Sequence, residues 1–511
     1  MTGRFRVSLV IAFVAMLVLP YALRPAGQKL RSDAQRLVII AAGLQTVWYE
    51  FERAFSDWHE RHYGTPVDID WRSPGGSSAI HQFLNARYSA VDALNDPNQR
   101  GIGIDLLFGG GYIDHEQQKR AGHTEPCGIR SEHPELLSPD IIPPTLAGAV
   151  LYDRDDHYYG FCLTLFGILA NTEAMARQGI PADLIPPRTW RDLGSPRLAG
   201  KISMADPAQS GSVVKVFEIV IQQEMRAALE ERRGASGGFG WSAEAERGVL
   251  DEGFWRGMRL TQRIAANSRR ITRTSAEAAM DVLQGDSLAA MCVDYYGLTQ
   301  AEIATRPDGS SRVMYFTPPG GTAGGSDPVS LLRGAPHPEV AKRFIHFCLT
   351  PEGQRLWCYR VGAPGGPVKY TLHRPPIRRD MYTDENLRYF ANPDVQPYAM
   401  SERFAYRAEW TGPLYNFIRV FLRAMCIDTH NELREAWAAM VAAGQTEPDS
   451  PAMGELQAMP ALTYASLFDE AFRRRLRDPV EVVNLSREWS EHFRRQYRKA
   501  ATIAREQGAA R

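Results

Sequence analysis

Residues 36–71 read RLVIIAAGLQTVWYEFERAFSDWHERHYGTPVDIDW, and this stretch decides the fold class. It opens with a β-rich apolar run at 36–42 and closes with a second β-rich run at 67–71. Between the two runs, large aromatic residues recur at helical spacing, namely Trp48, Phe51, Phe55 and Trp58. Strand, helix and strand in this order predict a βαβ unit and therefore an α/β protein with a parallel sheet.

The alternation continues beyond this unit. The sequence predicts a helix over 77–90 with a serine cap, a strand over 103–108 and a helix that ends at Gly122. A Pro-rich break, SPDIIPPT at 138–145, then precedes a second alternating set. We therefore expect a first lobe over 36–147, completed by about 325–369, and a second lobe over 148–324. Residues 370–511 carry apolar stripes at helical spacing and are expected to form a helical C-terminal extension.

The N-terminus carries an export or anchoring signal. Arg4 and Arg6 precede the apolar run at 7–23, so residues 1–24 are expected to form a signal peptide or an uncleaved membrane anchor. Small residues at a cleavage position are missing, which leaves both forms open. In either form the rest of the chain is expected in the periplasm, with the inner membrane as a partner of the N-terminal segment.

Composition excludes partners that a strong overall charge would attract. The chain has 511 residues, with 59 Lys and Arg against 59 Asp and Glu, so no global field favours nucleic acid. The six cysteines are scattered without a C-x-x-C pair, which argues against a zinc site. Any binding function must therefore be local.

Three Gly- and Ser-rich stretches each follow a predicted strand and open a predicted helix: SPGGSSA at 73–79, FGGG at 108–111 and ADPAQSGS at 205–212. Free backbone N–H groups at helix starts favour anions, although a plain capped turn would explain each stretch alone. Ligands of open α/β sheets gather at the carboxyl ends of the strands, so a shared cleft is expected. The candidate ligand-binding residues are Gly76, Ser77, Ser78, Gly110, Gly111, Ser210, Gly211 and Ser212.

Catalytic signatures are largely missing from the sequence. It has no Walker A loop and no H-E-x-x-H pair. Ser236 lies in a formal G-x-S-x-G match, but the charged helix end MRAALEERR precedes it, whereas a nucleophile elbow needs a buried strand there. We therefore predict no catalytic residue and no enzyme activity, with an exported hydrolase as the weakest alternative.

Four stretches together resemble the periplasmic solute-binding proteins of ABC importers, in particular the ferric-iron-type branch. They are TWRDLGSPRLAGKISMADPAQSGS at 189–212, GDSLAAMCVDYYG at 285–297, YFTPPGGT at 315–322 and DPVSLLRGAPHPEVAKRFIHFCLTPEGQ at 327–354. The resemblance implies a two-lobed, type II binding-protein fold and an ABC permease as partner. It also implies that the lobes close over a ligand about two crossing segments, near 145–160 and 313–328.

The same resemblance gives a role to Tyr295 and Tyr296, because consecutive tyrosines after a second-lobe strand coordinate the metal in the iron-binding members. The first-lobe strand ends, at 41–48 and 108–115, carry no charged residue at the turn where those members add a histidine and a carboxylate. Two transported ligands therefore stay open, ferric iron held by both tyrosines or a small anionic organic solute. No resident cofactor is expected. A membrane-anchored sensory or scaffolding receptor that uses the same cleft is the alternative function.

Overall fold

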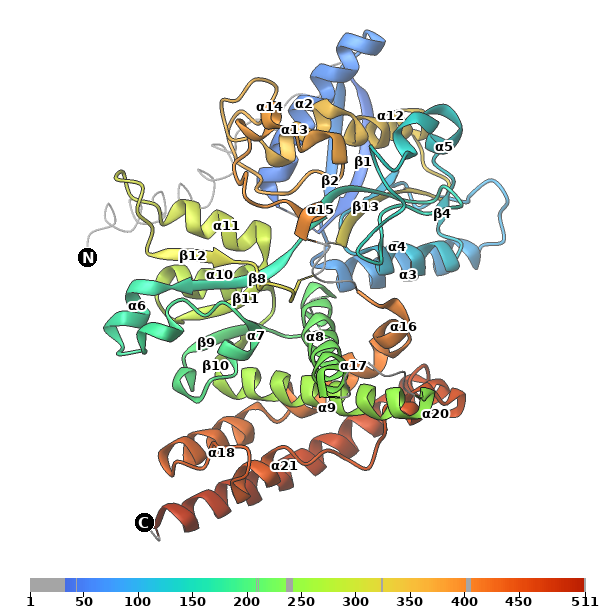
Figure 1. Cartoon of the computed structure of the whole chain (residues 1–511). Coiled ribbons are helices and arrows are strands. Elements are labelled where there is room, and N and C mark those ends of the chain that lie inside the picture. Colours follow the sequence, from blue (N-terminus) through green and yellow to red (C-terminus); the bar gives the residue numbers. More distant parts are fainter. Residues whose placement is uncertain are drawn as a thin grey trace, which may run out of the picture.

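The structure, a computed structural model, describes residues 33–42, 44–207, 209, 211–235, 242–322, 325–400 and 406–509. Two β-sheets lie one above the other in Figure 1, each flanked by helices, and a helical layer lies below the second sheet. This is the expected α/β, two-lobed architecture of type II with a C-terminal helical extension. The apolar run at 7–23, the predicted signal or anchor, lies outside the described residues, as does Ser236.

The first sheet has the order β2-β1-β3-β13-β4, and β7 pairs with β13. Strand β1 is buried from Leu37 to Ala41, and α2 buries Phe51, Phe55 and Trp58 on one face before Gly64 ends the helix with φ 76°. The strands are β1 (Gln35–Ala41), β2 (Val67–Arg72), β3 (Leu106–Phe108), β4 (Thr124–Glu125), β7 (Tyr159–Thr164) and β13 (Gly325–Leu332). The flanking helices are α2 (Gln45–Tyr63), α3 (Ser77–Asp92), α4 (Tyr112–Arg120), α5 (Ile129–Glu132), α12 (Pro338–Leu349) and α13 (Pro351–Cys358).

The second sheet has the order β10-β9-β11-β8-β12. Its strands are β8 (Phe166–Asn171), β9 (Ile202–Ala205), β10 (Ser268–Thr272), β11 (Ala289–Val293) and β12 (Val313–Phe316). The helices around it are α6 (Thr172–Arg177), α7 (Trp190–Leu193), α8 (Gly211–Ala235), α9 (Ala243–Asn267), α10 (Ser275–Gln284) and α11 (Asp294–Ile303).

Both sheets are mixed: the parallel pairing expected from the sequence is confirmed for β1 and β2, whereas other strands of each sheet pair antiparallel. In the first sheet β1 runs parallel to β2 and β3, whereas β13 runs antiparallel to β3, β4 and β7. In the second sheet β9 runs parallel to β10 and β11, whereas β8 runs antiparallel to β11 and β12. The reason is that β13 belongs to a chain segment that returns from the second sheet to the first.

The chain crosses between the sheets at two places. β7 pairs with β13 and β8 with β11, so the first crossing lies at Leu165, beyond the expected segment 145–160. The second crossing runs between the end of β12 and the start of β13, inside the expected segment 313–328. The hydrogen bonds of β7 keep residues up to Thr164 with the first sheet. The expected lobe boundary at 147 therefore stays a prediction rather than a feature of the sheet pairing.

The C-terminal part divides into two stretches with different neighbours. Residues 368–400 are mostly irregular, with α14 (Asp384–Leu387) and α15 (Pro397–Met400), and they pack on the first lobe. The fully buried carboxylate of Glu50 anchors this stretch by accepting from the amides of residues 368, 369 and 370. The expected helical extension thus begins later than residue 370, because these residues follow the first lobe's surface instead of a helical period.

Residues 406–509 form the helical layer and share one hydrophobic core with α8 and α9 of the second lobe. The fully buried Trp437 and Tyr497 reach that core from α18 and α21. The helices of this layer are α16 (Ala408–Thr411), α17 (Tyr415–Leu422), α18 (His430–Ala442), α19 (Pro451–Leu456), α20 (Glu470–Arg475) and α21 (Pro479–Ala509).

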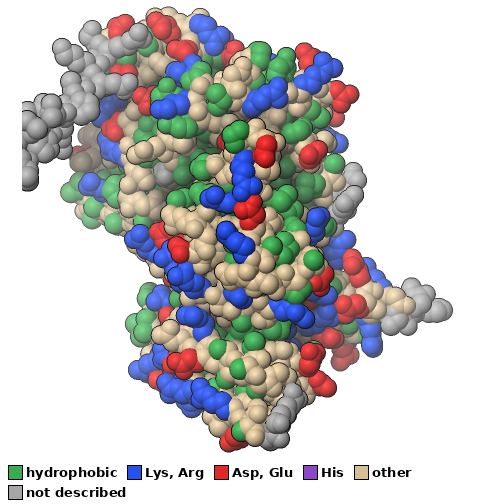
Figure 2. Space-filling view, turned by 90° about the vertical axis from the view of Figure 1, so that its left-hand side faces the viewer, with side chains coloured by type: hydrophobic (Ala, Val, Ile, Leu, Met, Phe, Trp, Pro, Cys, Tyr) green, Lys and Arg blue, Asp and Glu red, His purple; other side chains and the backbone are tan. Residues whose placement is uncertain are grey.

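The distribution of surface charge and the state of the cysteines agree with what the sequence predicts. On the face drawn in Figure 2, basic and acidic side chains are interspersed, as a formal net charge of +0 leads one to expect. All six cysteines are free and buried, and they behave as small apolar side chains. Among the helices of the described residues, none combines the length and apolar character needed to span a membrane.

The shared core makes a prediction about stability. Phe421 of α17 is fully buried and contacts Trp255 of α9 and Trp489 of α21. We expect Phe421→Ala to lower the free energy of unfolding by about 3–5 kcal/mol, because it leaves a cavity between three helices. Urea denaturation followed by circular dichroism would measure the loss. Val480→Ala, at a 69% exposed side chain of the same extension, is the control and should change it by less than about 0.5 kcal/mol. A loss at Phe421 no larger than the control's would contradict the shared core.

Candidate functional site: a cavity between the two sheets

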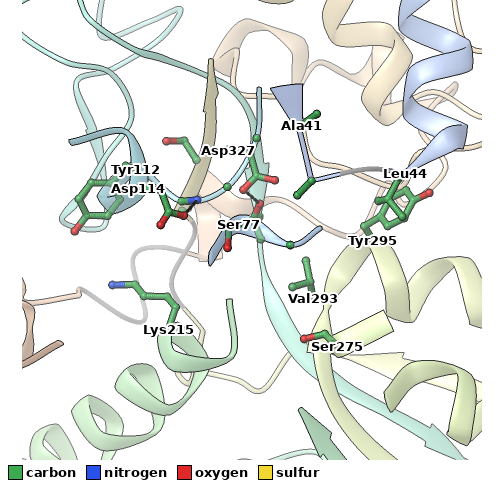
Figure 3. A pocket seen from close by; sticks show the side chains of 18 of the residues that line it. Ala41, Leu44, Ser77, Tyr112, Asp114, Lys215, Ser275, Val293, Tyr295 and Asp327 are labelled. Atoms are coloured by element: carbon green, nitrogen blue, oxygen red, sulfur yellow. Dashed lines mark hydrogen bonds between the residues drawn. The ribbon is translucent and has the colours of Figure 1, made fainter. Parts of the chain in front are cut away.

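A cavity of about 240 Å³ lies between the two sheets. Its wall includes the carboxyl ends of strands from both: Ala41 of β1, Phe108 of β3 and Val293 of β11 (Figure 3). Segments close to the two crossings also contribute, with Thr164 and Phe166 on one side and Gly325 on the other. The position is the one expected for ligands of open α/β sheets.

The predicted ligand-binding residues reach this cavity in part. Gly76, Ser77, Gly110, Gly111, Tyr295 and Tyr296 all line it. Ser78 is not among the lining residues, since it lies one position further along α3. Ser210 lies outside the described residues, and Gly211 and Ser212 begin α8, where only their backbone is described.

The helix starts differ from the expectation in how they are capped. The N-cap of α3 is Gly76, without a side-chain cap, so the expected serine cap is wrong and Ser77 faces the cavity instead. At α4 the backbone N–H of Gly111 donates to the carboxylate of Asp114 at 3.0 Å. The start of α4 therefore already holds a negative charge, which reduces its attraction for a second anion.

Arg374 is the principal charged residue near the crossings, and sequence reasoning missed it. Its side chain is 10% exposed and donates to Asp294 at 3.2 Å, to Asp327 at 3.1 Å and to the hydroxyl of Thr164. Burial lowers its pKa, but Asp327 and Asp294 outweigh that effect and hold the pKa above its usual value. The guanidinium therefore stays charged. Arg374 lines the cavity together with Asp327 and Thr164.

Asp294 links this cluster to the tyrosine pair. It is buried at the start of α11, and its carboxylate accepts from the amides of Leu165 at 3.0 Å and Tyr295 at 2.8 Å. Burial raises the pKa of Asp294 to about 6, against the lowering effects of Arg374 and the two amides. One carboxylate thus organises the first crossing and the start of the helix that carries both tyrosines.

The two tyrosines differ in their surroundings. Tyr295 is buried and belongs to the core of the first lobe, although it comes from α11 of the second. Its hydroxyl shares a 2.5 Å hydrogen bond with the hydroxyl of Thr46 in α2, so the pair joins the two lobes. The Tyr296 ring stands edge-on to it, with centroids 5.5 Å apart. Burial raises the pKa of both phenols.

A second cation, Lys215, faces the cavity from the first turns of α8 (Figure 3). Its ammonium lies 2.9 Å from Glu218 and 3.3 Å from the ring centroid of Tyr406. Burial holds the pKa of Lys215 below its usual value, and Glu218 offsets only part of this effect. Neither Lys215 nor Asp114 carries a local sequence signal beyond a helix start, which explains why both were missed.

His115 lies one helical turn after Gly111 and supports the glycine turn at 109–111, which forms part of the cavity wall. It is fully buried, with Nδ1 at 2.6 Å from the Ser330 hydroxyl and Nε2 at 3.1 Å from the Gly109 carbonyl. Because a carbonyl only accepts, Nε2 carries a proton. Burial lowers the pKa of His115 to about 4, so near neutral pH the imidazole is neutral and Nδ1 accepts from Ser330.

The described residues contain no group of three or more His, Cys, Asp or Glu side chains arranged to hold a metal ion. The polar groups around the cavity are instead phenols, hydroxyls, backbone amides, two cations and the carboxylates of Asp114 and Asp327. Two α/β lobes joined by two crossings, with this cavity at their strand ends, define a two-lobed solute-binding protein of type II.

Comparison with known proteins agrees with this class. The family model described as "Bacterial extracellular solute-binding protein" matches residues 104–379, and the chain belongs to this family. The phosphoglycerate transport regulatory protein PgtC of Salmonella typhimurium is 23% identical over 286 residues, which cover 56% of this chain. The matched part spans 58% of that relative's length. An uncharacterized protein of Haemophilus influenzae is 24% identical over 64% of this chain and 79% of its own.

Two solved structures, one of them titled a periplasmic binding protein, are also similar to part of this chain. AfuA of Actinobacillus pleuropneumoniae, with exogenous fructose-6-phosphate bound, is 21% identical with a TM-score of 0.46, over 63% of this chain and 81% of its own. Iron-bound HitA of Pseudomonas aeruginosa is 15% identical with a TM-score of 0.46, over 75% of this chain and 99% of its own.

The neutral His115 makes a prediction about pH. The folded protein binds a proton at His115 less tightly than the unfolded chain does, so this group costs stability as the pH falls from about 6.5 to about 4. We expect the wild-type protein to lose about 3 kcal/mol more than His115→Gln over that range. Denaturant unfolding at several pH values would measure the difference. His492→Gln, in the distant α21, is the control, and parallel curves for wild type and His115→Gln would contradict the assignment.

Proposed function

We propose that the chain captures a small anionic organic solute in the cavity between its lobes and delivers it to the permease subunits of an ABC importer. The observation that carries this proposal is a small cavity that both lobes line and that two largely covered cations, Arg374 and Lys215, border. A solute enclosed there would lose its hydration, so it needs charged partners of opposite sign at the wall. Membership of an extracellular family supports a site of action in the periplasm.

The carboxylates around the cavity narrow the class of solute that we propose. Arg374 is shared between Asp294 and Asp327, and Asp114 also lines the cavity. Burial and the nearby carboxylate of Asp327 raise the pKa of Asp114, against the lowering effects of His81 and the Gly111 amide. Carboxylate oxygens facing a cavity accept hydrogen bonds, which suits hydroxyl groups on the solute. A hydroxylated carboxylate, phosphate or phosphonate fits both kinds of group, and the name of the phosphoglycerate-related protein in Salmonella agrees with this class.

Ferric iron is the second solute that the sequence left open. Tyr295 and Tyr296 both line the cavity, as iron ligation requires. Against iron, the Tyr295 hydroxyl is engaged with Thr46, and burial raises the pKa of both phenols, which makes phenolates harder to form. These observations favour the organic anion over the metal.

A receptor that senses the solute and regulates transport is the second candidate function. The PgtC relative is named a transport regulatory protein, and the extension of this chain beyond residue 379 lies outside the family match. The same cavity would serve either role. Co-purification with permease subunits would support delivery, whereas co-purification with a membrane-bound signalling protein would support the receptor.

If the solute is an anion, removing a positively charged side chain from the cavity wall should lower the affinity for it. Trp48 and Trp357 line the cavity, so their fluorescence should report binding of 3-phosphoglycerate. We expect Lys215→Met to weaken binding at least about tenfold, because a charge-assisted hydrogen bond to the solute is lost. Lys342→Met is the matched control, since Lys342 lies on α12 away from the cavity and pairs with Glu339. Equal affinity in wild type and Lys215→Met would contradict the proposal.

The choice between solutes has its own measurement. If ferric iron is the cargo, the protein mixed with ferric citrate should develop a visible phenolate-to-iron charge-transfer band, and Tyr295→Phe or Tyr296→Phe should remove it. If the cargo is an organic anion, we expect no band, and both phenylalanine variants should keep most of the affinity for 3-phosphoglycerate. A charge-transfer band that appears in the wild type and disappears in either variant would show that the solute is ferric iron and not an organic anion.

A further inference from the structure

Tyr406 spans the two lobes at the Lys215 end of the cavity. Its backbone N–H donates at 2.8 Å to the carbonyl of Ala147, in the turn between β5 (Thr145–Leu146) and β6 (Ala149–Val150). That turn lies against the first sheet, because the Ser326 hydroxyl of β13 donates to the carbonyl of Val150. The phenol of Tyr406 points the other way and donates at 2.5 Å to Glu218 of α8.

Residues 406–415, which we call the strap, are held firmly on the second lobe. Gln222 of α8 donates to the carbonyl of Arg407 at 2.8 Å and to the Thr411 hydroxyl at 2.6 Å, and it accepts from the Arg407 amide at 2.8 Å. The Thr411 hydroxyl donates in turn to Glu218 at 2.5 Å. This network is buried, so the strap is part of the folded structure around α8 rather than a peripheral loop.

The strap also packs closely against the first lobe. Gly148 has φ 85°, and a Cβ placed on it would lie 2.1 Å from the carbonyl oxygen of Tyr406. Only glycine allows this approach, so the turn between β5 and β6 and the strap are fitted to one another. The C-terminal extension therefore adds a further link between the lobes, besides the two chain crossings and the Tyr295–Thr46 hydrogen bond.

The cavity wall includes residues from this region. Lys215, Tyr112 of α4 and Tyr415 at the end of the strap all line it. Glu218 is surrounded by three donors, namely Lys215, Tyr406 and Thr411, and the ring of Tyr406 lies beneath the ammonium. Because Tyr406 and Thr411 share the charge of Glu218, Lys215 retains positive character toward the cavity.

We propose that the strap is a wall of the solute site, and that Tyr406 and Tyr415 set solute affinity and the preference for an anionic group at this end. The inference rests on the proposed solute-binding function and deepens it. It assigns the helical extension a part in recognition, with Tyr406 as a positioning residue that acts through Lys215 and Tyr415 as a residue that touches the solute.

The test uses the full chain and three substitutions. Tyr406→Phe keeps the ring beneath Lys215 but deletes the hydroxyl that holds Glu218. Tyr415→Phe deletes only a hydroxyl on the cavity wall. Gly148→Ala changes no lining residue but forces the strap away from the first lobe. The control is Tyr497→Phe, a fully buried tyrosine of the same extension whose hydroxyl donates at 2.9 Å to the Met425 carbonyl, outside both the strap and the cavity wall.

The probes are 3-phosphoglycerate, D-glycerate and inorganic phosphate, titrated by calorimetry, with thermal melts to confirm folding. We expect Tyr406→Phe and Gly148→Ala to weaken 3-phosphoglycerate binding about tenfold, and Tyr415→Phe at least about threefold. Tyr406→Phe should also narrow the preference for 3-phosphoglycerate over D-glycerate, a change that simple loosening of the fold would not produce. Tyr497→Phe should bind as the wild type does.

Two outcomes would overturn the inference in distinguishable ways. If the wild type binds a probe and the folded strap variants bind it equally well, the strap is only structural, while the proposed function stands. If the wild type binds none of the probes, the proposed function fails and the inference fails with it. Because Tyr415→Phe and Tyr406→Phe remove single hydroxyls, they decide the matter even where Gly148→Ala does not fold.

Discussion

A buried guanidinium beside the first crossing constrains the rest of this structure. Arg374 comes from the irregular stretch that packs on the first lobe, yet it pairs with Asp294 at the start of α11 in the second. A buried charge without partners would cost several kcal/mol, so the two carboxylates and the Thr164 hydroxyl must stay around it. The crossing, the start of α11 and the end of β7 are consequently placed relative to one another by one cation.

This arrangement pairs both cations of the cavity wall with carboxylates of the protein. Arg374 is offset by Asp294 and Asp327, and Lys215 by Glu218. An anionic solute must therefore compete with carboxylates of the protein for the same donors, instead of entering a site with unpaired positive charge. Such competition lowers affinity but raises selectivity, because only a solute with donors for the displaced carboxylates restores every hydrogen bond. This is the physical reason for expecting hydroxyl groups beside the anionic group.

The C-terminal part is divided between the lobes rather than attached to one of them. Residues 368–400 are fastened to α2 by Glu50, whereas residues 406–509 share the core of α8 and α9. Any closure of the lobes would therefore also change the relation between these two stretches. The strap lies where they meet, which explains why the extension and the solute cavity should be coupled.

Local patterns in the sequence determined the fold class and part of the site. The burial of β1 and of α2, the glycine turns after β2 and β3, and the tyrosine pair directly after β11 follow from periodicity and from turn sterics within a few residues. Only the tertiary structure decided the charge arrangement. Arg374 lies 80 residues from Asp294 and 210 from Thr164 in the chain, and Tyr406 lies 188 from Glu218. Such pairs leave no periodic signal, because their energy comes from burial together and not from the conformation of either segment alone.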